Sequence, residues 1–335
     1  MIKELIKQLL DKQDLDPLQM QQIMREILSG AVGTADIVAF LTSLNNKGET
    51  VVELTAAVNV MLEYVEPIIV NKPNILDTCG TGGDQLSTFN ISTITALVAS
   101  GAGVTVAKHG NRSVSSKCGS ADILEALGVK INMDTEKIKE CLYKIGIAFL
   151  FAPNLHLAMR QVMPARKQIA QKTIFNILGP LINPARATNQ LIGVYSKVWV
   201  RPLAEVLHNL GSKHILVVHG ADGLDEVTTA DKTFVTEVTD GRIKDYEIVP
   251  EDFGFKRASL NDLLGGSIDE NVKIAQDILA GKPGSRRDIV LFNAGCAIYA
   301  ADKAQTIAKG IRLAEESIDS KAALEKLEKL KEYSQ

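Results

Sequence analysis

Apolar residues recur at helical spacing along the first part of the chain. Asp16 followed by Pro17 is typical of a helix start, because aspartate caps free N–H groups and proline suits the first turn. Thr34 stands where it can cap a second helix, ADIVAFLTSL, and the segment 51–65 has the same period. We therefore predict a small all-helical N-terminal domain over residues 1–72.

The pattern changes after these helices. The polar turn NKPN, which contains Pro73, predicts a hinge near residues 71–75. Beyond it, the short apolar runs ILDTC, GVTVAK, IAFLF, QLIGVY and HILVVHG alternate with segments of helical period, which predicts βα units. The stretch TIFNILGPLINP breaks this rhythm, and we expect about 168–186 to rejoin the helical domain. The large domain then spans 73–167 and 187–335.

Two further patterns lie in the C-terminal half. The segment TFVTEVTDGRIKDYEIV predicts a β-hairpin with its turn at Asp240 and Gly241. From Asp288 onward the period is helical again. The predicted fold class is α/β: a small helical domain and a large α/β domain, whose mostly parallel central sheet is flanked by helices.

Composition and charge narrow the range of partners. The 335 residues carry a formal net charge of −3, which gives no global reason to bind nucleic acid or an anionic membrane, so we expect neither partner. No apolar run is long enough to span a bilayer. The cysteines form no CxxC pair, which fits reduced thiols in a cytoplasmic protein. They are Cys79, Cys118, Cys141 and Cys296.

A glycine-rich loop, GTGGD, follows the first predicted strand. Glycines at 80, 82 and 83 let backbone N–H groups approach a phosphate closely. The segment TFNIST then opens a helix ending at Gly101, and its N-terminus suits an anion. Neither the Rossmann nor the Walker spacing is present, which weakens dinucleotide and ordinary P-loop interpretations. The alternative is a glycine-rich turn before a capped helix.

A second loop, KHGNRSVSSKCGS, spans residues 108–120 and combines three cations, one amide, four serines and two glycines. A polyphosphate needs such a mixture of charges and hydrogen-bond donors. As a plain loop, this density of like charge is unfavourable without an anion between its arms, although a solvated loop is the alternative. We do not expect His109 to act as an acid or base.

Two more features contribute candidate ligands. Asp225 and Glu226 follow the strand HILVV, where open α/β sheets build sites, and their oxygens can bind Mg²⁺. A polar turn is the alternative. Arg160 and Arg166 lie on a predicted helix, where arginines are usually solvated, unless a substrate carboxylate needs two parallel hydrogen bonds.

The order and content of these motifs resemble anthranilate phosphoribosyltransferases, enzymes of tryptophan biosynthesis. The resemblance rests on GTGGD, TFNIST, KHGNRSVSSKCGSADILEALG, FLFAPNLHLAMRQV, TIFNILGPLINPA and VVHGADGLDE, and it covers essentially the whole chain. It implies transfer of the ribose phosphate of phosphoribosyl pyrophosphate (PRPP) to the amine of anthranilate. It also implies two Mg²⁺ ions per site and a homodimer formed through the helical domains.

Site residues follow from the resemblance position by position. The residues implied to hold PRPP are Gly80, Gly83, Asp84, Thr88, Asn90, Ile91, Ser92, Thr93, Lys108 and Ser120. Those implied to contact anthranilate are Gly80, Asn111 and Arg166, with Arg166 on its carboxylate. Those implied to bind magnesium are Ser92, Asp225 and Glu226. Cys79 and Cys118 depart from the family pattern near these positions. We hypothesise that thiol reagents inhibit the enzyme and that PRPP protects it.

The implied chemistry needs no dedicated general base, because the amine of anthranilate is already neutral at pH 7. The site must instead position two reactants and stabilise the charge of the departing pyrophosphate. Two rivals stay open. A pyrimidine nucleoside phosphorylase resembles this fold, but it needs no paired magnesium acids. A non-catalytic relative that binds nucleic acid is the second rival, and the absence of a basic excess argues against it.

Overall fold

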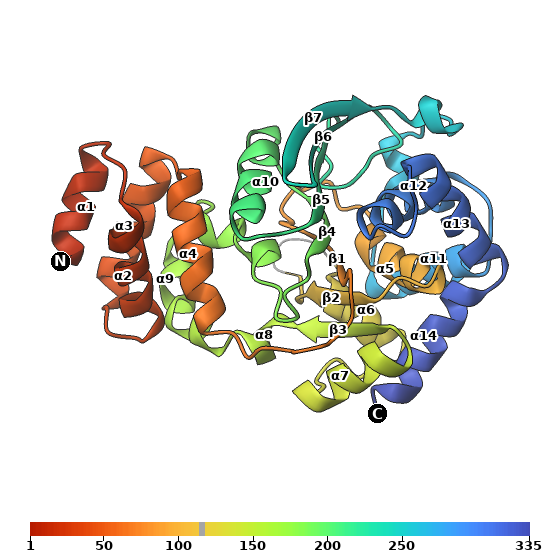
Figure 1. Cartoon of the computed structure of the whole chain (residues 1–335), viewed down its shortest axis with the longest axis horizontal. Coiled ribbons are helices and arrows are strands. Elements are labelled where there is room, and N and C mark those ends of the chain that lie inside the picture. The colour runs from red at the N-terminus through yellow and green to blue at the C-terminus, as the bar shows by residue number, and fades with distance from the viewer. Residues whose placement is uncertain (114–117) are drawn as a thin grey trace.

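The computed structural model describes residues 1–113 and 118–335 (Figure 1). Its first part is a bundle of helices α1 (Ile2–Leu10), α2 (Pro17–Leu28), α3 (Thr34–Lys47) and α4 (Val51–Glu63). The predicted start of α2 is confirmed, since the Asp16 side chain accepts a hydrogen bond of 2.9 Å from the Gln19 N–H. The predicted cap of α3 is wrong. Gly33 is the N-cap, and Thr34 is already the first helical residue, so its hydroxyl makes no cap bond.

A seven-stranded sheet forms the centre of the second part, in the order β3-β2-β1-β4-β5-β6-β7. Its strands are β1 (Leu76–Gly80), β2 (Val106–Gly110), β3 (Ile147–Phe151), β4 (Asn189–Gly193), β5 (His214–Gly220), β6 (Thr233–Thr239) and β7 (Arg242–Ile248). The first five run parallel, and β6 and β7 add an antiparallel hairpin. Its predicted turn is confirmed, with φ of 49° at Asp240 and 71° at Gly241. The fold class is therefore as predicted.

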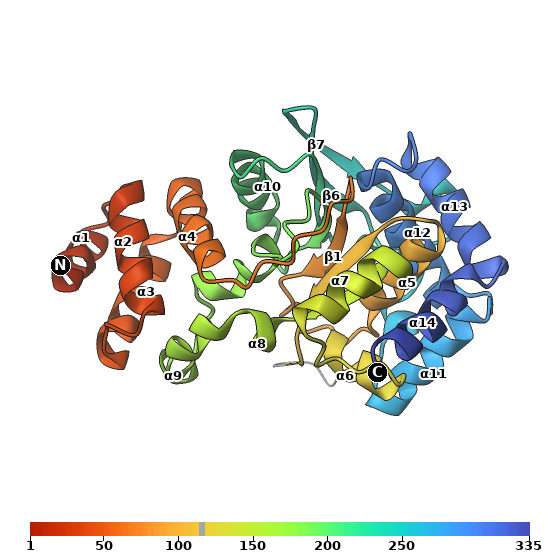
Figure 2. The same ribbon diagram turned by 60° about the horizontal axis from the view of Figure 1, so that its bottom comes forward.

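Helices flank this sheet and connect it to the bundle. They are α5 (Ile91–Gly101), α6 (Ser120–Ala126), α7 (Thr135–Lys144), α8 (Ala152–Leu155), α9 (Met163–Gln168), α10 (Val200–Asn209), α11 (Ile268–Leu279), α12 (Ser285–Ala300), α13 (Ile307–Asp319) and α14 (Ala322–Tyr333). Figures 1 and 2 show the bundle at one end of the molecule and α11, α13 and α14 at the other, with α8 between bundle and sheet and α9 beside the bundle. No helix in the described ranges has the length and apolarity needed to cross a membrane.

Two hydrophobic clusters meet the two faces of the sheet. Leu216 and Val218 of β5 belong to a cluster with α5, α12, α13 and α14. Ile215 and Val217 alternate with them and belong to a second cluster with α1 to α4 and α10. Buried residues of 174–182 join this second cluster. The sheet is thus covered on both faces, which leaves the ends of its strands as places for polar loops.

Candidate active site

The predicted loops all begin at one edge of the sheet. Gly80, Gly110 and Gly220 are the last residues of the parallel strands β1, β2 and β5. The carboxyl ends of parallel strands share an edge, and ligands of open α/β proteins bind there. Because β2, β1, β4 and β5 are neighbours, the glycine loop, the second loop and the acidic turn meet across a few strands.

Glycines allow the glycine loop and the acidic turn to approach closely. A Cβ atom on Gly80 would lie 2.9 Å from Asp225 Oδ2, and one on Gly193 would lie 1.5 Å from the Asp225 carbonyl oxygen. Gly82 and Gly83 have φ of 62° and 84°, a region that glycine adopts freely. The importance of Gly193, at the end of β4, was not apparent from the sequence.

Two carboxylates face each other at this contact. Burial, the charge of Asp84 and a hydrogen bond with the Asp84 side chain together raise the pKa of Asp225 to about 7, while the Gly82 N–H opposes the rise. Asp84 Oδ2 is buried and accepts no hydrogen bond from any described group. The hydrogen-bond donors around Asp84 and Asp225 therefore do not balance the negative charge of both carboxylates.

The adjacent acid extends the site to the start of α5. Burial raises the pKa of Glu226 well above its usual range, and Asp225 adds to the rise. The ammonium of Lys108 and the backbone N–H of Ser92, which donates a hydrogen bond to the Glu226 carboxylate, oppose it. Lys108 Nζ also lies 3.3 Å from Ser92 Oγ, so the acid and the start of α5 share one cation.

These oxygens fit a hard divalent cation. A buried carboxylate oxygen without a donor beside a second carboxylate is stabilised by a positive ion between them. Across the described residues, no three His, Cys, Asp or Glu side chains form a complete metal cage. That fits Mg²⁺, which usually binds one or two carboxylates and takes water and phosphate oxygens as its other ligands.

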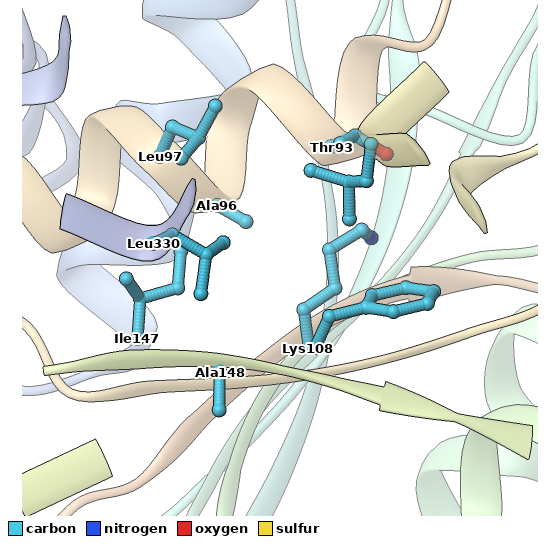
Figure 3. Close-up of a pocket in the computed structure, with 9 residues that line it drawn as sticks. Thr93, Ala96, Leu97, Lys108, Ile147, Ala148 and Leu330 are labelled. Carbon is cyan, nitrogen blue, oxygen red and sulfur yellow. The ribbon is translucent and has the colours of Figure 1, made fainter. Parts of the chain in front are cut away.

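Lys108 supplies a buried cation at the same place. Its Nζ donates to the Thr78 carbonyl and lies 3.3 Å from Ser92 Oγ. Burial lowers the pKa of Lys108, while Asp77, Cys79 and Glu226 counteract that effect. Figure 3 shows its methylene stem beside an apolar cavity and its ammonium directed toward Thr93 at the start of α5. The fold therefore holds this charge among acids and hydroxyls.

A buried carboxylate anchors the strand that carries Lys108. Asp77 accepts hydrogen bonds from the His109 N–H at 3.0 Å and from Asn183 Nδ2 at 2.7 Å. Asn183 also donates to the Ala107 carbonyl at 2.9 Å. Asp77 and Asn183 were not predicted from the sequence, because the Asn183–Asp77 contact spans 106 residues of chain without a local motif.

The ends of the second loop lie side by side. Ser120 Oγ donates to the Asn111 carbonyl at 3.1 Å and accepts from the Asn111 N–H at 3.2 Å. Arg112 forms ion pairs of 2.9 Å with Asp122 and Glu125. The expectation that this cation needs a bound anion is therefore wrong for Arg112, since acids of α6 already neutralise it. Val114, Ser115, Ser116 and Lys117 lie outside the described residues.

The start of α5 is joined to this loop. Asn90 Nδ2 donates to the Cys118 carbonyl at 2.8 Å, and Asn90 Oδ1 accepts from Thr93 Oγ1 at 2.9 Å. Thr88 forms an isolated bridge with Leu264. The Ile91 N–H donates to the Phe89 carbonyl at 2.8 Å, so it is occupied in this state. Asn90 thus joins the start of α5 to the end of the second loop.

Arg166 stands apart from these contacts. It lies on α9, half-buried, and burial lowers its pKa. Among the described residues it forms no ion pair with an acid, and no hydrogen bond joins it to Asn111 or Gly80. A free guanidinium of this kind can receive a carboxylate.

A pair of buried histidines lies near the second loop. His109 Nε2 and His156 Nε2 are 2.9 Å apart, and the His109 ring also donates to the Gly179 carbonyl. Burial lowers the pKa of His109 well below its usual range and that of His156 to about 4. Both rings are therefore neutral at pH 7, so neither is a ready proton donor.

Comparison with known proteins places this architecture in a class. The model described as "Glycosyl transferase family, helical bundle domain" matches residues 3–65, and "Glycosyl transferase family, a/b domain" matches residues 72–324. The fold and its polar strand edge are thus those of a two-domain glycosyltransferase. Anthranilate phosphoribosyltransferase of Persephonella marina is 52% identical over 336 residues, covering 100% of this chain and 99% of the relative. The chain belongs to the anthranilate phosphoribosyltransferase family and is an enzyme of the transferase class.

Solved structures agree. Anthranilate phosphoribosyltransferase from Thermus thermophilus has a TM-score of 0.93 and 40% identity, covering 98% of this chain and 99% of that chain. The enzyme from Saccharomyces cerevisiae in complex with PRPP and Mg has a TM-score of 0.91 and 29% identity, covering 99% and 97%. The yeast enzyme is also known in complex with 4-fluoroanthranilate, with a TM-score of 0.89 and 28% identity, covering 99% and 97%.

Proposed function

We propose that this enzyme transfers the phosphoribosyl group of PRPP to the amine of anthranilate, giving N-(5-phosphoribosyl)anthranilate and pyrophosphate in tryptophan biosynthesis. The observation that carries the proposal is the buried ammonium of Lys108, which lies 3.3 Å from Ser92 Oγ at the start of α5 and interacts with the charge of Glu226 in the acidic turn. Family membership and the relatives' complexes support the same reaction.

The proposed PRPP site is the strand edge. Gly80, Gly83, Asp84 and Thr88 come from the glycine loop, and the first turn of α5 and Lys108 face it. Helix N-termini, buried cations and hydroxyls are donors suited to phosphate oxygens. Donors fixed before the reaction stabilise charge as it develops on departing pyrophosphate, and one such donor is typically worth roughly 3–4 kcal/mol.

Magnesium belongs to this proposal as well. Asp225 and Glu226, with the Ser92 hydroxyl, are the proposed ligands of two Mg²⁺ ions, and Asp84 faces the same site. Bound ions would supply positive charge to the pyrophosphate oxygens and to the facing carboxylates. The buried Asp84 oxygen without a donor supports a cation here.

The proposed anthranilate site uses Gly80, Asn111 and Arg166. Arg166 would bind the carboxylate through two hydrogen bonds, which leaves the amine free to attack the ribose. Fixing two reactants in an attack geometry can contribute on the order of 7–11 kcal/mol. A site of this kind needs no general base, and the two neutral histidines fit that expectation.

We also propose a hinge near residues 71–75 between the helical and α/β domains, and a homodimer formed through the helical domains. Exposed apolar side chains on the bundle, Leu10 at 63% and Leu18 at 75% exposure, support an interface there. Light scattering coupled to gel filtration tests the dimer, and a monomer at micromolar concentration would refute it.

One assay tests the reaction. Purified enzyme is mixed with PRPP, anthranilate and Mg²⁺, and the loss of anthranilate fluorescence is followed. We expect turnover that stops on chelation of Mg²⁺ and resumes on its return. Phosphorolysis of thymidine or uridine without any loss of anthranilate fluorescence would instead identify a nucleoside phosphorylase.

A further inference from the structure

Lys172 lies directly over the glycine loop. Its Nζ donates a hydrogen bond of 2.9 Å to the Gly83 carbonyl and stands 3.2 Å from the centroid of the Tyr195 ring. The Tyr195 N–H in turn donates to Thr81 Oγ1 at 3.0 Å. The side chain of Lys172 and the backbone of Tyr195 are therefore both hydrogen-bonded to the same loop.

The acids beside this ammonium are Asp225 and Asp84. Partial burial lowers the pKa of Lys172, and the charges of Asp225 and Asp84 oppose that effect from beyond ion-pair distance. Glu226, by contrast, has Lys108 as its cation. The two lysines thus divide the acidic site, with Lys108 at the α5 side and Lys172 at the glycine-loop side.

We propose that Lys172 is a positioning residue that serves as the counter-ion of Asp84 and Asp225 in the free enzyme and thereby couples divalent-ion binding at Asp225 to the arrival of PRPP. This inference rests on the proposed function. A fixed monovalent cation beside the carboxylates repels a divalent ion that seeks the same oxygens. Pyrophosphate oxygens offer Lys172 another partner and add negative charge, so the ion binds well only together with the diphosphate.

The first test measures Mn²⁺ binding to the free protein by electron paramagnetic resonance, without PRPP. We expect weak binding to the wild type and binding at least about tenfold tighter to Lys172→Met, because the competing charge is gone. Lys172→Arg keeps the charge and is expected to match the wild type. Adding Asp225→Asn to Lys172→Met is expected to abolish the gain, which locates the ion.

Lys197→Met is the matched control. Lys197 Nζ lies 3.6 Å from the centroid of the Phe234 ring, so the variant removes the same kind of lysine–aromatic contact elsewhere. We expect its Mn²⁺ affinity to equal that of the wild type. If Lys172→Met does not fold, Tyr195→Leu, which removes the ring beneath the ammonium, is measured against Tyr195→Phe, which keeps it.

The second test adds inorganic pyrophosphate. We expect it to tighten Mn²⁺ binding strongly in the wild type and at least several-fold less in Lys172→Met, because only the wild type must release the lysine. Equal Mn²⁺ affinity of wild type and Lys172→Met without pyrophosphate overturns the inference. If the wild type also converts anthranilate in the presence of PRPP, the proposed function stands while the role of Lys172 fails.

Discussion

The two ends of strand β5 carry buried charged groups with very different surroundings. At its beginning, His214 lies between Glu237 at 3.0 Å and Asp302 at 2.7 Å, and the Tyr299 hydroxyl donates to Glu237 at 2.7 Å. Beyond its other end, Asp225 faces Asp84, whose Oδ2 has no donor. The first group is internally complete. The second leaves Asp84 Oδ2 without a donor until a ligand supplies positive charge, which is how a binding site differs from a structural network.

The largest effect is expected from neutralising the two acids beyond the end of β5. Asp225→Asn combined with Glu226→Gln removes the proposed metal ligands, and we expect turnover to fall by roughly 1,000-fold and its Mg²⁺ dependence to change. The same variant is expected to unfold at a higher temperature than the ligand-free wild type at pH 8. Its folded state no longer holds ionised carboxylates whose pKa values burial has raised.

The control for this variant is Asp222→Asn in the same turn. Asp222 accepts hydrogen bonds from Thr228 Oγ1 at 2.5 Å and from the Leu224 N–H at 3.2 Å, so its role is internal. We expect it to lower stability and to leave the Mg²⁺ dependence unchanged. Wild-type Mg²⁺ kinetics in the double variant would rule out the metal role of Asp225 and Glu226.

At the His214 end of β5, we expect a substitution to lower stability and leave turnover unchanged. Glu237→Gln breaks a buried ion pair, and we expect it to cost about 3 kcal/mol of unfolding free energy, with turnover per folded molecule unchanged. Burial lowers the pKa of His214, but hydrogen bonds to Glu237 and Asp302 outweigh it and raise that pKa overall. Burial raises the pKa of Glu237, but hydrogen bonds from His214, Tyr299 and Tyr246 outweigh it and lower that pKa overall.

The pH dependence of this cost follows from those directions. Stability from a raised histidine pKa is fully present below the unfolded value of about 6.5 and is lost as pH rises through the folded value. Stability from a lowered glutamate pKa is present above its unfolded value of about 4.3 and is lost as pH falls through the folded value. Urea unfolding is therefore expected to show the largest loss near pH 5.5 and a smaller one at pH 9. An equal loss at both pH values would contradict the ion pair.

A smaller effect is expected from Arg166→Ala. Hydrogen bonds to charged groups are worth about 1.5–3 kcal/mol, so we expect the KM for anthranilate to rise roughly 10- to 100-fold with little change for PRPP. Arg160→Ala is the matched control, because Arg160 is an exposed arginine in the short turn just before α9. An unchanged KM for anthranilate with weaker PRPP binding in Arg166→Ala would show that the carboxylate assignment is wrong.

These comparisons also show what the sequence could predict. The alternation of strands and helices, the hairpin at Asp240 and the placement of GTGGD, KHGNRS and GLDE at one strand edge all follow from local patterns. Parallel strands place the loops that follow them at one edge of the sheet, whatever the length of the connecting segments. The N-cap of α3 failed by one residue, which is the usual precision of a cap assigned from sequence.

Contacts between distant segments were not predictable in this way. Lys172 meets Gly83 across 89 residues, and its position carries no motif that distinguishes it from a solvated lysine. The approach of Asp225 to the end of β4 requires glycine at position 193, because a Cβ atom there would clash with the Asp225 carbonyl oxygen. That requirement becomes visible only in the folded structure. The partners of Arg112 lie on α6, so its neutralisation likewise needed the fold.

The smallest effect concerns the thiols beside the site. Burial raises the pKa of Cys118 to about 11 and that of Cys79 well above its usual range, and Cys79 Sγ donates to Asp77 at 3.3 Å. At pH 7.5 the thiolate fraction of such groups is below about 0.1%, so we expect alkylation by iodoacetamide to be at least roughly 50-fold slower than for an ordinary exposed cysteine. The residual rate is expected to rise about tenfold per pH unit and to fall when PRPP is bound. Rapid inactivation at pH 7.5 would show that one of these thiols is exposed and ionised, in conflict with the raised pKa values that burial gives them.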